Sequence, residues 1–191
     1  KIKVIHNPVS LSYTYSPKEF NEINPRVLHI GTRPNKNLER VIEALEGIKC
    51  HLRIIGKLTS EQEKLLSEKK IKYSNGINLT DEEILNEYIL CDIVSFPSLY
   101  EGFGMPVIEA QAVGRVVLGA EIEPLIEISN RAMCFVDPYD SESIRRGFTE
   151  LISSQYYRNN LIEKGLENVD KFKPDAIANQ YYKIYKSIAQ S

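Results

Sequence analysis

The sequence has little cysteine and no long apolar run, and both shortages narrow its class. The three cysteines, Cys50, Cys91 and Cys134, lie far apart and show no CxxC or Cys/His spacing. This pattern argues against a structural zinc site or a disulfide framework and fits a reducing compartment. No apolar run reaches the roughly 20 residues that a membrane helix needs, and no charged-then-apolar leader opens the chain. We therefore expect a cytoplasmic protein with no transmembrane segment.

The chain also lacks an excess of charge of either sign. Its 24 Lys and Arg residues against 26 Asp and Glu residues give a net charge of −2. A basic excess is the usual footprint of nucleic-acid or anionic-membrane binding, so no nucleic-acid partner is expected. The first residue is Lys1 rather than methionine, and we expect the chain to be a fragment of a longer protein.

Short apolar runs alternate with amphipathic stretches along most of the chain. The runs are RVLHIG (26–31), HLRIIG (51–56), CDIVSFP (91–97), RVVLGA (115–120) and AMCFVDP (132–138), with a weaker one, KIKYSNGI, at 70–77. Apolar runs of this length, bounded by Gly, Pro or polar residues, are typical of buried parallel strands. Between them lie expected helices, among them NKNLERVIEALEGI (35–48) and a segment with a capping box formed by Thr80 and Glu83.

This alternation predicts the α/β class: a doubly wound, Rossmann-like parallel sheet with helices on both faces. After Asp140 the chain is expected to be a helical tail, with helices at about 141–153, 155–170 and 174–190. We expect residues 1–191 to form a single domain. Sheets of this kind bind ligands at the carboxyl ends of their strands.

The segment SLYEGFGMPVIEAQAVG (98–114) follows one predicted strand and places two glutamates around a glycine-bent turn. A helix is expected to begin near Met105, because Pro106 suits a first turn. The N–H groups of residues 103–105 would then point outward at the positive end of that helix, where phosphate oxygens bind. Glu101 and Glu109 could each accept two hydroxyl hydrogen bonds from a sugar or a ribose. The alternative, that both are ordinary solvated residues, remains open on spacing alone.

A second loop, GTRPNKN (31–37), joins the first clear strand to a helix expected to begin near Lys36 or Asn37. Arg33 and Lys36 could supply cations for a phosphate at the same edge of the sheet, although a solvated surface pair is the alternative. Gly56 and Lys57 follow the next strand and give only a weak signal.

In this order, these segments resemble the family 4 (group 1) glycosyltransferases, retaining enzymes of the GT-B architecture, and specifically their carboxyl-terminal, donor-binding half. KIKVIHNPV resembles the entry into that half, HIGTRPNKNLERVIEAL its basic loop and helix, and PSLYEGFGMPVIEAQAVG its Glu-x7-Glu signature. CFVDPYDSESI and NVDKFKPDAIANQYYKIY resemble the closing segments. The resemblance implies an absent amino-terminal half that binds the acceptor. It also implies that the last helix leaves part of its apolar face exposed.

The resemblance also implies a role for each matched residue. Glu101 would contact the donor sugar near its reacting centre, and Gly102, Phe103, Gly104 and Met105 would form the loop that contacts sugar and diphosphate through its backbone. Glu109 would hold the ribose, and Lys36, with Arg33, would neutralise the diphosphate leaving group. Catalysis would therefore rest on Glu101 and Lys36, with a nucleotide-diphosphate sugar as substrate, no metal, no cofactor and no covalent nucleophile. The isolated domain is expected to be inactive without its other half, through which peripheral contact with the inner face of the membrane is an open alternative.

Two other functions compete with this hypothesis. A glycoside hydrolase would use Glu101 and Glu109 as acid and nucleophile, which requires carboxyl groups about 5 to 5.5 Å apart. A sugar-nucleotide-binding partner or regulatory subunit without turnover would carry the same binding motifs. His29 falls inside a predicted strand and is expected to be a packed core residue rather than a catalyst. The nucleobase should rest near Gly56 and residues 73–79, whose sequence does not reveal which base binds.

Overall fold

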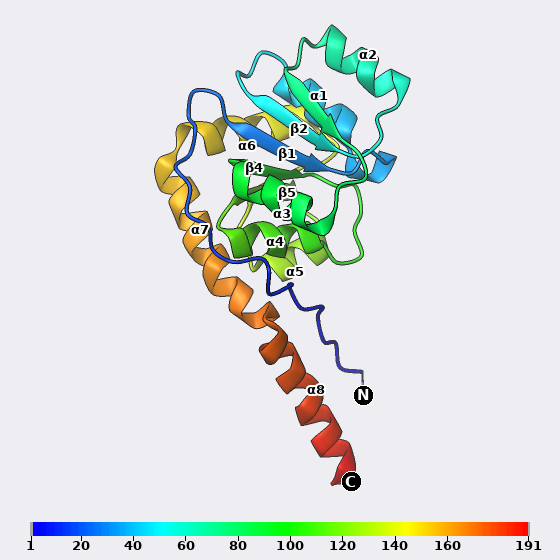
Figure 1. Ribbon diagram of the computed structural model, residues 1–191, viewed down its shortest axis with the longest axis vertical. Coiled ribbons are helices and arrows are strands. Elements are labelled where there is room, and N and C mark those ends of the chain that lie inside the picture. The colour runs from blue at the N-terminus through cyan, green and yellow to red at the C-terminus, as the bar shows by residue number, and fades with distance from the viewer. Residues whose placement is uncertain (1, 191) are drawn as a thin grey trace.

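Six parallel strands form one sheet at the centre of the computed structural model, which describes residues 2–190 (Figure 1). The strands lie in the order β3-β2-β1-β4-β5-β6, and every pair of neighbours is parallel. They comprise β1 (Arg26–Ile30), β2 (His51–Ile55), β3 (Tyr73–Gly76), β4 (Ile93–Phe96), β5 (Val116–Ala120) and β6 (Cys134–Val136). The predicted doubly wound α/β fold is confirmed.

Burial explains why some strands are plain in the sequence and one is not. Every residue of β4 and of β5 is buried, so both faces of these strands carry apolar side chains. The edge strand β3 has the sequence YSNG and leaves Tyr73 39% exposed. An edge strand has less apolar surface to bury, and its periodicity signal is correspondingly weak.

Helices cover both faces of the sheet and build two hydrophobic cores (Figure 1). One core joins the sheet to α3, α4 and α5, and the other joins it to α1, α2, α6 and α7. Cys50, Cys91 and Cys134 are all buried. The helices are α1 (Leu38–Leu45), α2 (Ser60–Glu68), α3 (Asp81–Leu90), α4 (Met105–Val113), α5 (Glu123–Ser129), α6 (Ser141–Ser153), α7 (Gln155–Val169) and α8 (Pro174–Ala189), with 3-10 turns η1 (Pro34–Lys36) and η2 (Asp170–Phe172).

The helix starts largely follow the predicted signals. The capping box at Thr80 is present: its hydroxyl accepts from the N–H of Glu83, whose carboxylate accepts from the N–H of Thr80. A second box, between Thr59 and Gln62, opens α2. Helix α4 begins at Met105 as predicted. Helix α1 begins at Leu38, later than predicted, because Asn37 adopts a left-handed conformation with φ 64°.

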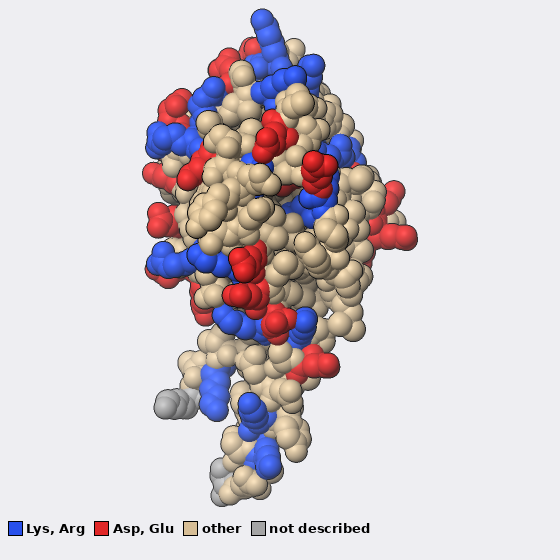
Figure 2. Space-filling model, turned by 90° about the vertical axis from the view of Figure 1, so that its left-hand side faces the viewer, with Lys and Arg blue, Asp and Glu red and all other residues tan. Residues whose placement is uncertain are grey.

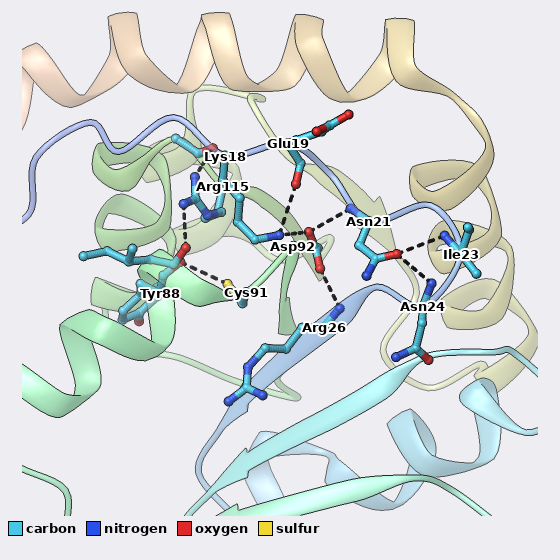
Figure 3. Close-up of polar contacts among 12 residues, drawn as sticks. Lys18, Glu19, Asn21, Ile23, Asn24, Arg26, Tyr88, Cys91, Asp92 and Arg115 are labelled. Atoms are coloured by element: carbon cyan, nitrogen blue, oxygen red, sulfur yellow. Dashed lines mark hydrogen bonds and ion pairs between the residues drawn. The ribbon is translucent and has the colours of Figure 1, made fainter.

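The segment before β1 has no helix or strand among its described residues, and a buried carboxylate fastens it to the amino end of the sheet (Figure 3). Asp92, 5% exposed, accepts hydrogen bonds from the N–H of Arg26 at 2.7 Å and of Asn21 at 3.1 Å. It also forms an ion pair with Lys18. A buried charge that is paired and hydrogen-bonded is tolerated, so this contact fixes the path by which the chain enters the domain.

The last helix, α8, projects well beyond the rest of the molecule (Figures 1 and 2). Of its described residues only Ile177 is buried, and its exposed aromatic and aliphatic side chains are Tyr181, Tyr182, Tyr185 and Ile188. The expectation that part of the apolar face of this helix is exposed is confirmed. Positive and negative side chains interleave on the face seen in Figure 2, in line with the small net charge. Among residues 2–190, no helix combines the length and apolar character that a bilayer crossing requires.

Candidate functional site

The site predicted from the sequence lies where the strand order reverses. Strand β1 is flanked by β2 on one side and β4 on the other, so the loops that follow β1 and β4 leave the same edge of the sheet side by side. In open α/β sheets such a reversal opens a crevice in which ligands bind. Residues 31–37 and 97–104 form these two loops.

Hydrogen bonds from one asparagine join these loops. The side-chain amide of Asn37, 2% exposed, donates to the carbonyl oxygens of Pro97 at 2.9 Å and Pro138 at 2.7 Å. The N–H of Leu99 donates to the carbonyl of Asn35 at 2.9 Å. Buried polar groups that satisfy one another in this way hold the loops in one arrangement. The start of α1 is therefore fixed against the loops that follow β4 and β6.

The structure brings the predicted cation and the first predicted carboxylate together. The ammonium Nζ of Lys36 lies 2.6 Å from Oε1 of Glu101 and 4.7 Å from the centre of the Phe96 ring. The two side chains are only 23% and 12% exposed. Charge-assisted hydrogen bonds are short, and a cation over an aromatic face gains further attraction. Two close contacts thus hold Lys36 beside Glu101 at the carboxyl end of the sheet.

His29 lies in the core of the sheet, as the sequence predicts. It is 1% exposed, and its Nδ1 lies 3.4 Å from Oγ of Ser95 on β4. Burial, and secondarily the positive charge of Lys36, lower its pKa to about 4. His29 is therefore neutral at physiological pH and adds no charge beneath the Lys36–Glu101 pair.

The amino end of α4 presents free backbone donors. Among the described residues 2–190, no hydrogen bond uses the N–H of Phe103, Gly104 or Met105. Gly104 precedes the helix with φ 105°, a conformation that favours glycine. Unpaired N–H groups at the start of a helix carry partial positive charge. They form a donor set of the kind that binds phosphate or sugar oxygens.

Packing explains only one of the two glycines of this loop. A Cβ at Gly104 would lie 2.5 Å from Cδ2 of Leu125 and 2.9 Å from Cδ1 of Ile128, so packing against α5 requires glycine. A Cβ at Gly102 would meet nothing within 4 Å. The fold therefore leaves Gly102 free to vary, whereas a ligand that approaches the backbone closely would require it.

The second predicted carboxylate, Glu109, contacts a buried tyrosine. The hydroxyl of Tyr88, itself 0% exposed, donates to Oε2 of Glu109 at 2.7 Å. Burial raises the pKa of Glu109, and the hydrogen bond from Tyr88 only partly opposes that rise. The ring of Tyr13, from the segment before β1, packs edge-on against Tyr88 with centroids 5.6 Å apart. Glu109 thus has one fixed oxygen, and Tyr88 determines where its carboxylate lies.

The other predicted cations, Arg33 and Lys57, are exposed and do not join the Lys36–Glu101 pair. Arg33 is exposed, and its side chain makes no hydrogen bond or ion pair within residues 2–190. Lys57 is likewise exposed. The glycine at Gly56 is explained by the fold: a Cβ there would lie 3.0 Å from the Thr32 side chain, whose hydroxyl donates to the carbonyl of Lys57 at 2.7 Å.

Two functional candidates, Asn37 and Tyr88, were missed by the sequence analysis. Asparagine before a helix is a known left-handed former, so Asn37 carried a signal that a turn analysis could have used. Tyr88 lies in an apolar helical pattern and has no signal that separates it from a core residue. Across residues 2–190, no three His, Cys, Asp or Glu side chains converge on a point that could hold a metal ion.

Comparison with known proteins finds relatives among the glycosyltransferases. The sequence profile of the family described as "Glycosyl transferases group 1" matches residues 16–168. A serotype-specific mannosyltransferase of Escherichia coli, WbdA, is 28% identical over 161 residues, which are 84% of this chain and 17% of that protein. This chain therefore spans less than a fifth of WbdA.

Two solved structures share the fold. A glycosyltransferase from Rickettsia africae superposes with a TM-score of 0.85 at 22% identity, covering all of this chain and 58% of that one. The crystallised C-terminal domain of a glycosyl transferase group 1 protein, LpcC from Francisella tularensis, superposes with a TM-score of 0.72 at 23% identity. That match covers 87% of this chain and 99% of the LpcC domain. With a profile match over most of its length and this fold, the chain belongs to the group 1 glycosyltransferases.

Proposed function

We propose that this chain is the donor-binding half of a glycosyltransferase and binds a nucleotide-diphosphate sugar at the carboxyl edge of its sheet. The observation that carries the proposal is the Lys36–Glu101 pair. It brings a cation from the loop after β1 to the loop after β4, which also carries the free N–H groups of residues 103–105. A cation and a helix amino-terminus suit a diphosphate, and a carboxylate suits sugar hydroxyls. A cytoplasmic location, where buried thiols stay reduced, is part of the proposal.

Each side chain has a role in this proposal. Lys36 leaves Glu101 to contact the diphosphate, and the released carboxylate of Glu101 accepts hydrogen bonds from the donor sugar. The N–H groups of Phe103, Gly104 and Met105 bind sugar or phosphate oxygens, while Glu109, held by Tyr88, accepts the ribose hydroxyls. Arg33 is exposed at the rim, where it can turn toward the phosphates when they bind.

The proposed chemistry follows from where charge develops. Cleavage of the bond from sugar to diphosphate builds positive charge on the anomeric carbon and negative charge on the leaving phosphate. Preorganised cations and dipoles aimed at that phosphate lower the barrier. In our proposal Lys36 and the amino end of α4 supply this stabilisation without a metal, and the acceptor enters on the face from which the diphosphate leaves, so the sugar configuration is retained. We propose no covalent nucleophile.

In this proposal the acceptor depends on the rest of the protein, whereas the donor sugar can be tested on this chain. The name of WbdA describes mannose transfer by that protein, so mannose nucleotides are the first donors to test. The competing function, a sugar-nucleotide-binding subunit without turnover, has the same binding site. Transfer by a longer form of the protein that includes an acceptor-binding half would distinguish the two.

The direct test is calorimetric titration of this chain with UDP, GDP and ADP, and with their sugar nucleotides, in EDTA. We expect one base to bind without metal. Lys36→Ala should weaken the nucleoside diphosphate about tenfold or more, the value of one or two charge-assisted hydrogen bonds, and should weaken the nucleoside far less. Lys64→Ala, at a 76% exposed lysine on α2, is the matched control. An unchanged ratio of diphosphate to nucleoside affinity in Lys36→Ala would contradict the role of Lys36.

A further inference from the structure

The loop that precedes α4 is anchored by one aromatic side chain, Phe103, which lies against two other rings. The centroid of Phe103 is 5.6 Å from that of His6 and 6.3 Å from that of Phe172, and His6 and Phe172 are also 5.6 Å apart. Each ring therefore touches both of the others. Edge-on and tilted contacts at these distances are favourable beyond the area that they bury.

The two supporting rings come from segments far apart in the sequence. His6 precedes β1 and Phe172 lies in η2, so both fall outside residues 16–168, the part of the chain that the family profile matches. A backbone hydrogen bond of 2.9 Å, from the N–H of Val9 to the carbonyl of Phe172, joins the two segments. Val9 and Phe172 are each 3% exposed. The support behind the loop is thus a packed unit made from both flanks of the matched region.

The first half of the loop is held by Asn37 and by the Lys36–Glu101 pair, whereas its end, just before α4, has fewer polar contacts. The N–H groups of residues 103–105 have no hydrogen-bond acceptor within residues 2–190, and Gly102 has open space where a side chain would be. Gly104 rests on α5. Phe103 is the side chain by which the loop packs into the core between the sheet and α3, α4 and α5. The ring of Phe103 is therefore the contact through which His6 and Phe172 reach the end of the loop.

We propose that His6 is a positioning residue for residues 101–104: its ring fixes Phe103 and thereby aims the free N–H groups of the loop. The imidazole Nε2 of His6 also lies 3.4 Å from Oε1 of Glu127 on α5, but that glutamate side chain is 66% exposed. Exposed ion pairs contribute little, so the ring, rather than the charge, carries the effect. The consequence for ligand binding rests on the proposed function, whereas the ordering of the loop does not.

The first experiment measures the loop without any ligand. Backbone order parameters of residues 102–105, from nitrogen-15 relaxation, should fall from about 0.85, the rigid range, to below about 0.6 in His6→Ala. His6→Gln, which keeps a polar group but has no ring, should behave like His6→Ala. His6→Phe should restore the wild-type values, and Glu127→Gln should leave them unchanged. His51→Ala, at a partly buried histidine on β2 far from the loop, controls for the loss of any histidine.

The second experiment measures binding with UDP, GDP, ADP and their sugar nucleotides. We expect His6→Ala to weaken the sugar nucleotide about five- to tenfold more than the matching diphosphate, and His6→Phe to recover that difference. Unchanged order parameters in His6→Ala, or low values in His6→Phe, would overturn the proposal. If His6→Ala loosens the loop while the wild-type chain binds no nucleotide, the positioning role of His6 stands and the proposed function fails.

Discussion

At the scale of single residues, the two glutamates of the signature have opposite electrostatic surroundings. Glu101 has a cation, Lys36, 2.6 Å from its carboxylate. Within residues 2–190 Glu109 forms no ion pair; it accepts a hydrogen bond from the neutral hydroxyl of Tyr88, and burial, followed by the negative charge of Asp81, raises its pKa. A buried carboxylate without a cation is costly when ionised. Residues kept for function at the expense of stability have this character, which is what our proposed role for Glu109 requires.

We predict that Glu109→Gln makes the protein more stable at pH 7. The raised pKa means that the folded state binds a proton more tightly than the unfolded state, so wild-type stability falls as pH rises from the unfolded to the folded pKa. Glutamine keeps an oxygen that can accept from Tyr88 and never ionises. Urea unfolding should therefore give a higher free energy for Glu109→Gln at pH 7 and equal values below about pH 4.

The same substitution should weaken nucleotide binding, since the amide cannot accept two ribose hydroxyls as a carboxylate does. Glu163→Gln, on the surface of α7, is the control and should change neither property. A lower free energy of unfolding for Glu109→Gln at pH 7 would show that the carboxylate stabilises the fold and is not a strained functional group.

Sequence reasoning could propose the side chains of the candidate site but not the contacts that those side chains make. Lys36, Glu101 and Glu109 were identified by their place after strands or in a helix start, because polar residues at the ends of apolar runs are conspicuous. The Tyr88–Glu109 and Asn37–Pro138 contacts join residues 21 and 101 positions apart. Such contacts depend on how helices and loops pack, which local periodicity does not encode.

At the scale of elements, the turn before α4 and the helix itself differ in how firmly the core holds them. The turn is bounded by β4 on one side and rests on α5 through Gly104. Helix α4 is apolar almost all round, with six buried residues, and is held in the core. Because α4 is held in the core, we expect any adjustment to a ligand to fall on residues 101–104 rather than on the helix.

The two loop glycines give a matched pair of variants. Gly104→Ala combines a left-handed backbone with overlap on Leu125 and Ile128, and we expect it to lower the free energy of unfolding by about 2–4 kcal/mol. Gly102→Ala adds a methyl group to open space and should stay within about 0.5 kcal/mol of wild type. Thermal and urea unfolding of both variants measure these values.

The pair also separates fold from function. If a ligand approaches the loop backbone, Gly102→Ala should weaken sugar-nucleotide binding despite its normal stability. Wild-type affinity in Gly102→Ala would mean that no ligand atom comes near that position. A Gly104→Ala protein as stable as wild type would show that α5 moves aside easily.

The predicted boundaries of helices and strands were accurate where the sequence signal is local. Buried strands and capped helices were predicted within a few residues, because burial on two faces and capping boxes both act locally. Helix α1 was placed one or two residues early, since the hydrogen bonds that hold Asn37 in its left-handed conformation reach Pro97 and Pro138. Nothing within residues 31–37 could have revealed those partners.

At the scale of the whole molecule, α8 is attached to the domain by its first turns only. Ile177 is its one buried residue among those described, and the four large side chains further along are 45% to 66% exposed. Exposed apolar groups gathered on one segment are typical of a surface that another protein part covers. The part of the helix beyond its first turns should therefore contribute little to the stability of this chain.

We predict that ending the chain after Gln180 changes the thermal midpoint by less than about 2 °C, because the removed part buries almost nothing. Ile177→Ala is the contrasting variant and should cost about 2–5 kcal/mol, as expected for a buried isoleucine. Calorimetry of both proteins decides the matter. A large drop on truncation would mean that the outer half of α8 packs on the domain in solution.

The order of strands in the sheet also has a consequence for folding during synthesis. β1 pairs with β4, which follows it by about 60 residues. At roughly 5–20 residues per second, one edge of β1 waits roughly 3–12 s for its partner. An unpaired apolar strand edge is a template for contact with other chains. We therefore expect the yield of folded protein to depend on how well chaperones cover this strand edge during translation, and less on the stability of the finished fold.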